Sequence, residues 1–385
     1  MPPQLHAVLG ASSAKRWLTC TPSARLGERL TSRFGSESSP YAQEGTKAHA
    51  LAEIKVRKAF YAADGMTTTV YSRMSEEERD AYTGINAFRC DALRAELGDI
   101  PSDMEHATDA YCDVVMEKYL SAKDRDPSTR LLLEQRLDYS RWVPSGFGTG
   151  DCVIVSDSLL EVCDYKHGMG IPVDAVDNPQ LRLYGLGAID KFGQLYDFPA
   201  VRMTIIQPRI SADPSEDEMT VDDLLAWGTE IHPLAVEAFN GPGVFVPGEH
   251  CKFCRGKAKC RARANINTAL EDFAACVPMG RVPADEPKDN ITRRAMGLQK
   301  ALTDEEIGQL LTRGQFLVSW YDDLKAYAQQ TILDGGEIPG WKVVAGRSVR
   351  AFHDTDAAFQ TLIKAGYDEA MLYDRKPVSL SELEK

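Results

Sequence analysis

Apolar and polar positions follow a helical period in the first third of the chain and a strand period in the middle. Helical spacing predicts three helices in the first part, over residues 40–63, 75–98 and 103–122. A short helix or turn is expected to end at Cys20, because Pro22 follows it. Ser and Gly residues predict a loop over 31–40, and Pro40 is typical of the first turn of a helix.

Short apolar runs in the middle of the chain predict four strands, at residues 130–139, 151–155, 159–166 and 200–207. The second and third form a hairpin around the polar turn 156–158, after a Gly-rich turn at 146–150. A helix over 179–192 precedes the fourth strand. This order of helices and strands predicts an α/β fold whose central mixed sheet is flanked by helices.

The last third contains further helices and a basic, Cys-rich segment. The expected features are a helix at 221–240, the Cys-rich segment at 248–263, a linker at about 277–290, a helix at 304–332, and a strand or hairpin at 341–352. No internal repeat is found.

Composition narrows the class of protein. The 385 residues include 44 Lys or Arg and 57 Asp or Glu, which gives a net charge of −13, and 43% are hydrophobic. These values exclude wholesale disorder and collagen, and the length suggests two domains, or one domain with a large appendage. No apolar run of about 18 residues predicts a membrane span, and no secretory signal is expected.

Nine cysteines without an export signal indicate a reducing cytoplasm and possible metal ligands. The acidic balance argues weakly against a general nucleic-acid binder.

Two acids and a lysine form the sharpest chemical pattern. Asp164 and Lys166 point to one face of a strand, and Asp151, placed at the start of the preceding strand, can reach the same end. Paired carboxylates repel each other unless a cation such as Mg²⁺ or Mn²⁺ lies between them. Lys166 could then orient an attacking water or stabilise developing negative charge. The alternative is a salt bridge on a hairpin.

Other side chains accompany this pattern. His49 shares a helix face with Glu53, Gln180 and Tyr184 are one helical turn apart, and Glu134 is a further candidate acid. Each also has a structural alternative: a solvated histidine, a partly buried helix face and an exposed acid. The Gly-rich turn is not a phosphate loop, because a strand follows it instead of a helix.

Three thiols lie within ten residues, at Cys251, Cys254 and Cys260, and Cys20 is the best fourth ligand on local grounds. Spacing alone leaves both zinc and a 4Fe–4S cluster open. Such a site would close a long loop and so matter for stability. The surrounding basic residues are candidate DNA-backbone contacts: Lys252, Arg255, Lys257, Lys259, Arg261 and Arg263. Their alternative role is to balance the charge of the thiolates.

Six elements in one order resemble the PD-(D/E)XK nuclease superfamily, in particular its RecB-like branch with an iron–sulfur cluster. That branch includes the AddB nuclease domain and CRISPR-associated exonucleases. The elements are Cys20, the G-T-x-x-H segment Gly45 to His49, the G-x-x-D segment Gly148 to Asp151, the D-Y-K strand Asp164 to Lys166, the Q-x-x-x-Y pair Gln180 and Tyr184, and the trio Cys251, Cys254 and Cys260. The full chain also resembles a phage and prophage family of this type.

The resemblance implies a restriction-endonuclease-like core with helical insertions over residues 1–265, a linker over 266–290 and a mainly helical region over 291–385. It implies that His49, Asp151, Asp164 and the carbonyl of Tyr165 bind Mg²⁺ or Mn²⁺. It also implies that Lys166 serves the attacking water, that Gln180 and Tyr184 support the site, and that the four cysteines hold a 4Fe–4S cluster.

The expected function is therefore a metal-dependent DNA exonuclease that processes DNA ends in phage recombination or repair. A phage single-strand annealing protein is an expected partner, and the bacterial cytoplasm is the expected location. The alternatives are a non-catalytic DNA-binding or assembly module of the same fold, with zinc or a cluster, and a zinc-stapled binding protein with an incidental D-x-K pattern.

Overall fold

Five strands form one mixed sheet, seen in a computed structural model that describes residues 7–34, 40–63, 87–241, 243–268, 304–344, 355–368 and 371–372. The strands are β1 (Arg130–Asp138), β2 (Phe147–Val155), β3 (Leu160–Tyr165), β4 (Ala200–Ile206) and β5 (Ser215–Thr220). They lie in the order β1-β2-β3-β4-β5. Strands β3 and β4 are parallel, and the other neighbours are antiparallel.

Helices account for most of the remaining described residues. They are η1 (Ala11–Ser13), α1 (Ala14–Thr19), α2 (Ser23–Phe34), α3 (Pro40–Ala63), α6 (Ala87–Glu96), α7 (Ser102–Arg125), α8 (Pro179–Phe192), α9 (Val221–Asn240), η2 (Glu249–Phe253), α10 (Arg261–Thr268), α12 (Asp304–Leu333) and α13 (Thr355–Lys364).

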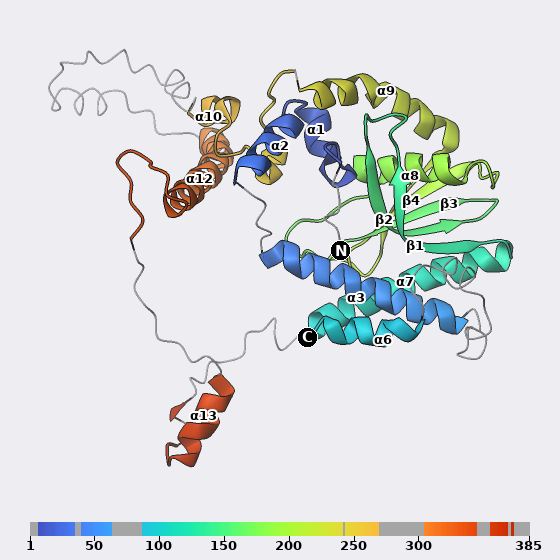
Figure 1. The fold of residues 1–385 in the computed structure, drawn as a ribbon, viewed down its shortest axis with the longest axis horizontal. Coiled ribbons are helices and arrows are strands. Elements are labelled where there is room, and N and C mark those ends of the chain that lie inside the picture. Colours follow the sequence, from blue (N-terminus) through green and yellow to red (C-terminus); the bar gives the residue numbers. More distant parts are fainter. Residues whose placement is uncertain are drawn as a thin grey trace. The chain divides into compact units, whose positions relative to one another are not determined.

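The sheet is covered on both faces (Figure 1): α8 and α9 lie on one face, and α3, α6 and α7 on the other. Strand alternation sends successive side chains to these two layers. The α8 side of the core includes Val153, Val155, Leu160 and Val162. The α3 side includes Cys152, Ile154, Cys163 and Tyr165. All six residues of β3 are buried, as expected for a central strand covered twice.

Helix α8 makes the crossover between the two parallel strands. The Asn178 side chain accepts hydrogen bonds from the backbone N–H groups of Gln180 and Leu181, and Pro179 occupies the first turn. Gly187 lets the helix lie close to β1, because a Cβ there would come within 2.9 Å of Leu137 Cβ. The helix start, which carries Gln180, is therefore fixed beside the carboxyl end of β3.

The predicted α/β class with a mixed sheet between helices is confirmed, as are the helices at 40–63, 179–192 and 221–240. The predicted turn at 146–150 is wrong, because β2 already begins at Phe147. Its glycines serve packing: a Cβ at Gly148 would lie 2.7 Å from the Tyr184 ring. Asp151 consequently lies inside a strand and not at its start.

Other boundaries also differ from the sequence expectation. Helix α2 extends to Phe34 into the predicted loop, whose next residues, 35–39, lie outside the described residues. Strand β5 was not expected, because its polar sequence SEDEMT lacks an apolar run. The described part of the predicted C-terminal hairpin, 341–344, is not a strand, and residues 345–352 lie outside the described residues. Of the helix expected at 75–98, the structure describes α6.

The chain divides into two compact units, Met1–Leu324 and Lys325–Lys385. The first three residues of the expected linker, 266–268, belong to α10, and the rest of it lies outside the described residues. The boundaries of the expected nuclease domain stay a prediction. Within the described residues, no helix has the length and apolar character that crossing a bilayer requires.

Candidate active site and cysteine pocket

The β2–β3 hairpin brings two carboxylates together. Its last ladder pair is Cys152 with Cys163, so the next residues, Asp151 and Asp164, follow on neighbouring strands. Asp164 is 2% exposed. Burial raises the pKa of Asp164 above its usual range, and the negative charge of Asp151 raises it further, against the opposing effects of Lys166 and His49.

Lys166 and Gln180 partner the second of these acids. Lys166 Nζ lies 2.7 Å from Asp164 Oδ2 and donates to Gln180 Oε1 at 3.1 Å. The Gln180 amide also donates to Asp164 Oδ1 at 2.8 Å. Burial would lower the pKa of Lys166, but the charge of Asp164 and its hydrogen bond more than offset this, so the pKa is raised. Gln180 thus hydrogen-bonds to both the lysine and the acid.

Tyr184 lies one turn further along α8 and is buried. Its ring occupies the space above Gly148, on the strand that carries Asp151. Burial raises the pKa of Tyr184, and a hydrogen bond with Gln180 acts in the opposite direction. The Q-x-x-x-Y pair therefore contacts both strands of the hairpin.

His49 reaches this hairpin from α3. Its Nδ1 lies 3.3 Å from Asp151 Oδ1, and its ring packs edge-on against the Tyr165 ring at 5.3 Å. The other oxygen of Asp151, Oδ2, accepts the backbone N–H of Tyr165 at 2.8 Å. Burial lowers the pKa of His49, but the hydrogen bond and charge of Asp151 outweigh it, so the pKa is raised. The expected convergence of imidazole, acids and amine is present.

Further acids line a small pocket of about 200 Å³ beside His49 and Asp151, which also includes Glu53 and Glu134. Glu134 lies opposite Asp151, between the ladder pairs Leu133–Cys152 and Gln135–Gly150, and its φ of 50° is unusual for a residue with a side chain. The backbone strain and the acidic neighbours mark this position as part of the site. Glu134 itself is solvent-exposed, yet the atoms packed around it and the charge of Asp151 raise its pKa to about 8.

The donor set fits a hard divalent cation. Asp164 Oδ2 is buried and lies 2.7 Å from Lys166 Nζ, so an ion bound there would share this oxygen with the lysine. The carboxylate oxygens of Asp151 and Asp164 are the kind of ligand that suits Mg²⁺ or Mn²⁺. Among the described residues, no three His, Cys, Asp or Glu side chains are already grouped closely enough to hold a metal. Lys166 instead places a positive charge beside Asp164, and His49 lies beside Asp151.

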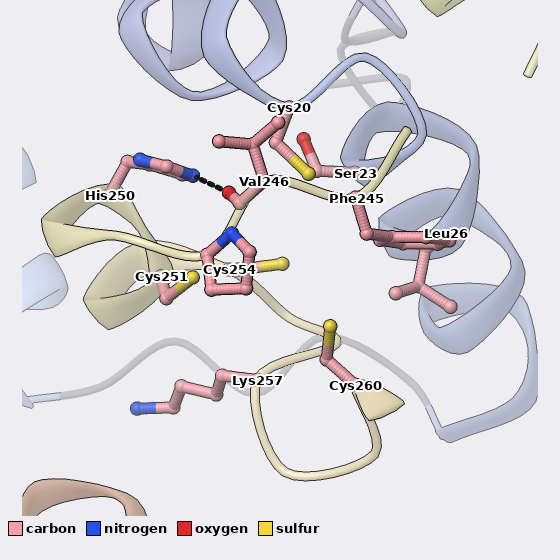
Figure 2. A pocket seen from close by; sticks show the side chains of 11 residues that line it. Cys20, Ser23, Leu26, Phe245, Val246, His250, Cys251, Cys254, Lys257 and Cys260 are labelled. Atoms are coloured by element: carbon pink, nitrogen blue, oxygen red, sulfur yellow. Dashed lines mark hydrogen bonds between the residues drawn. The ribbon is translucent and has the colours of Figure 1, made fainter. Parts of the chain in front are cut away.

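The four predicted cysteine ligands line one pocket. Figure 2 shows the thiols of Cys20, Cys251, Cys254 and Cys260 around it. All eight cysteines in the described part of the chain are free thiols. Burial raises the pKa of Cys20, and the proximity of Cys251 and Cys260 raises it further.

Backbone N–H groups point at several of these sulfurs. Gly248 N–H donates to Cys251 Sγ at 3.4 Å. Hydrogen bonds from the backbones of Val246 and Ser23 act on the Cys20 thiol and lower its pKa, against the larger effect of burial. Donors aimed at sulfur stabilise thiolates, which are the form that binds a metal or cluster. The pocket therefore fits a group held by four thiolates.

The basic residues near this pocket differ in availability. Lys252, Arg255, Lys259 and Arg261 are exposed. Arg263 is buried, and its guanidinium binds Asp323 Oδ2 at 2.5 Å. Lys257 Nζ lies 2.6 Å from Asp323 Oδ1. The expected DNA contact at Arg263 is therefore corrected to an internal ion pair, which the sequence did not reveal because Asp323 lies 60 residues away.

One charged group was missed by the sequence reasoning. Arg209, after β4, contacts His167, Glu44 on α3 and Asp103 on α7. The position of His167 directly after the D-Y-K segment was the one sequence signal for this group. Nothing in the sequence indicates that Arg209 contacts His167, Glu44 and Asp103.

Comparison with known proteins gives a family, and solved structures include a remote neighbour. The family model described as "Protein of unknown function (DUF2800)" matches residues 6–385. A solved structure titled "Crystal structure of SSO0001" is similar at 13% sequence identity over 62% of this chain and 94% of that chain, with a TM-score of 0.23. A score this low does not establish a shared fold.

Proposed function

This chain belongs to the DUF2800 family of proteins of unknown function, and we propose that it is a metal-dependent DNA exonuclease of the PD-(D/E)XK type. One observation carries the proposal: Asp151, Asp164, Lys166 and His49 meet at the end of one hairpin, with Lys166 Nζ 2.7 Å from Asp164 Oδ2 and His49 Nδ1 3.3 Å from Asp151 Oδ1.

The side chains have separable roles in this proposal. Asp151, Asp164 and His49, with the carbonyl of Tyr165, hold Mg²⁺ or Mn²⁺. The bound ion supplies a Lewis acid that offsets charge on the scissile phosphate. Lys166 places its ammonium group beside Asp164, where it orients the attacking water or stabilises the developing oxyanion. Gln180 fixes Lys166 and Asp164 relative to each other, because its amide oxygen accepts from Lys166 and its amide nitrogen donates to Asp164.

The four-cysteine pocket holds a 4Fe–4S cluster in this proposal, with zinc as the alternative. The exposed basic residues beside it contact the DNA backbone, and the net charge of −13 keeps non-specific binding weak. We propose DNA ends as the substrate, phage recombination or repair as the process, a single-strand annealing protein as a partner and the bacterial cytoplasm as the location.

Incubation of the purified protein with Mn²⁺ and end-labelled linear DNA tests the nuclease proposal. We expect degradation that stops when the metal is chelated, and a rate lowered by about 100-fold or more in Lys166→Ala, because a charge acting on the transition state is lost. Lys191→Ala is the matched control, since Lys191 binds Gln135 at the far end of α8.

The two contrary outcomes have different meanings. Equal degradation by Lys166→Ala and the original protein contradicts the proposed site. Metal binding and DNA binding without any cleavage favours the alternative function, a non-catalytic DNA-binding or assembly module of the same fold.

A further inference from the structure

Arg209 joins three elements beside the candidate metal site. It lies in the turn after β4, and its side chain is 12% exposed. Its Nη1 donates to Glu44 Oε1 of α3 at 2.9 Å, and its Nη2 donates to Asp103 Oδ2 of α7 at 2.7 Å. Nη1 also lies 2.8 Å from His167 Nε2. One guanidinium thus links both covering helices to the segment that follows β3.

His167 connects Arg209 to Tyr165, which belongs to the candidate site. His167 Nε2 lies 2.8 Å from Arg209 Nη1 and 3.2 Å from Glu44 Oε1, and His167 Nδ1 is hydrogen-bonded with Tyr165 Oη at 2.9 Å. Both the His167 ring and the Tyr165 ring are buried. Neither ring can therefore turn without breaking a buried hydrogen bond.

Tyr165 in turn contacts both Asp151 and His49. Its backbone N–H holds Asp151 Oδ2 at 2.8 Å, and its ring packs against the His49 ring. Glu44 adds a second connection, because it lies five residues before His49 on the same helix, which is about 7.5 Å along the helix axis. Arg209 therefore constrains His49 from two directions, through Tyr165 and through α3.

We propose that Arg209 and His167 are positioning residues that hold His49 and Asp151 in place to bind the divalent metal. This inference rests on the proposed metal site. Arg209 has three partners in this group, so it is not presented to solvent as a DNA contact. Removal of comparable residues beyond the direct ligands of a metal weakens metal affinity by about 10–100-fold.

Manganese affinity, measured by the loss of the free Mn²⁺ electron paramagnetic resonance signal, tests this inference without requiring activity. We expect Arg209→Leu and His167→Phe to weaken Mn²⁺ binding by about 10-fold or more, and Arg209→Lys to recover part of it. Arg202→Leu is the matched control: Arg202 lies near the start of β4 and binds Glu218 at 2.8 Å. It should bind Mn²⁺ as the original protein does.

Thermal melting separates positioning from folding. A folded Arg209→Leu protein with unchanged Mn²⁺ affinity overturns the inference, and so does a loss equal to that of Arg202→Leu. If Arg209→Leu does not fold, His167→Phe decides by the same criterion. If the original protein binds no Mn²⁺, the proposed function itself fails, which is a distinct result from an unchanged variant of a protein that binds.

Discussion

Single residues at the site show which interactions could be read from the sequence. Strand alternation placed Asp164 beside Lys166, and helical spacing placed Gln180 in line with Tyr184, because both are local geometric rules. Local rules could not predict that Arg209 contacts Glu44, because the two residues are 165 positions apart. They also could not predict that Arg263 is paired with Asp323 and is not exposed to solvent. The sequence also misjudged Gly148, because a glycine run reads as a turn unless the ring that packs on it is known.

Gly148→Ala should disturb the site through Tyr184. The added methyl group would lie 2.7 Å from the Tyr184 ring, so the ring or strand β2 must shift. We expect a loss of about 1–3 kcal/mol in the free energy of unfolding, measured by urea denaturation, with a lower cleavage rate. Gly27→Ala is the control, because no described atom lies within 4 Å of the added methyl group, and its stability should not fall. Equal stability of the two variants would show that Tyr184 can move without cost.

Elements of the fold were predicted best where they are long and periodic. Helices α3, α8 and α9 match their predicted ranges, and the β2–β3 hairpin was found from its polar turn. Strand β5 escaped detection because half of its residues are acidic and its pattern does not alternate in hydrophobicity. An edge strand paired on one side only can be this polar, and charge on it discourages pairing with other chains.

A buried ion pair connects helix α7 to the sheet. Lys118 Nζ lies 2.7 Å from Glu161 Oε1, which also accepts from Thr204 at 2.8 Å. Lys118→Met leaves the buried Glu161 charge without its main partner, so we expect a loss of about 3–5 kcal/mol by urea denaturation. Lys58→Met is the control: the Lys58–Asp91 pair is exposed, and its loss should cost about 0–1 kcal/mol.

The same pair predicts a dependence on alkaline pH. Burial lowers the pKa of Lys118, but the charge of Glu161 and the hydrogen bonds outweigh it, so the folded pKa is above the ordinary value of 10.5. The stabilisation is therefore complete below pH 10.5 and is lost as the pH rises through the folded pKa. The stability difference between Lys118→Met and the original protein should shrink over that range. A constant difference would show that Lys118 does not titrate there.

At the scale of the whole molecule, the cysteine pocket connects the beginning of the described chain to residue 260. Arg16 Nη1 donates to the Phe253 carbonyl at 3.2 Å, and Thr21 donates to Glu237 at 2.6 Å, so the N-terminal helices are held beside the same loop. Sequence spacing identified the three clustered thiols with ease. It assigned Cys20 on local grounds alone, whereas the structure shows that all four share one pocket.

Cys254→Ser should remove the visible absorbance of a cluster and lower the melting temperature. Protein purified without oxygen should be brown if a 4Fe–4S cluster is bound and colourless if zinc is bound, since zinc has no redox or d-electron chemistry. Cys112→Ala serves as the control, because Cys112 packs in the other core cluster, against α3. A Cys254→Ser protein with unchanged colour and melting temperature would rule out the four-thiolate group.

The chain order of these contacts also constrains when the protein can assemble. Three hydrogen-bond partners of the N-terminal segment lie more than 200 positions downstream, at Glu237, Phe239 and Phe253. During synthesis the first helices therefore leave the ribosome long before these partners exist, although α8, against which η1 and α1 also pack, is made earlier. The domain closes only after the last thiol has emerged, so ribosomes stalled before residue 260 should carry nascent chains whose N-terminal segment is still open to proteases.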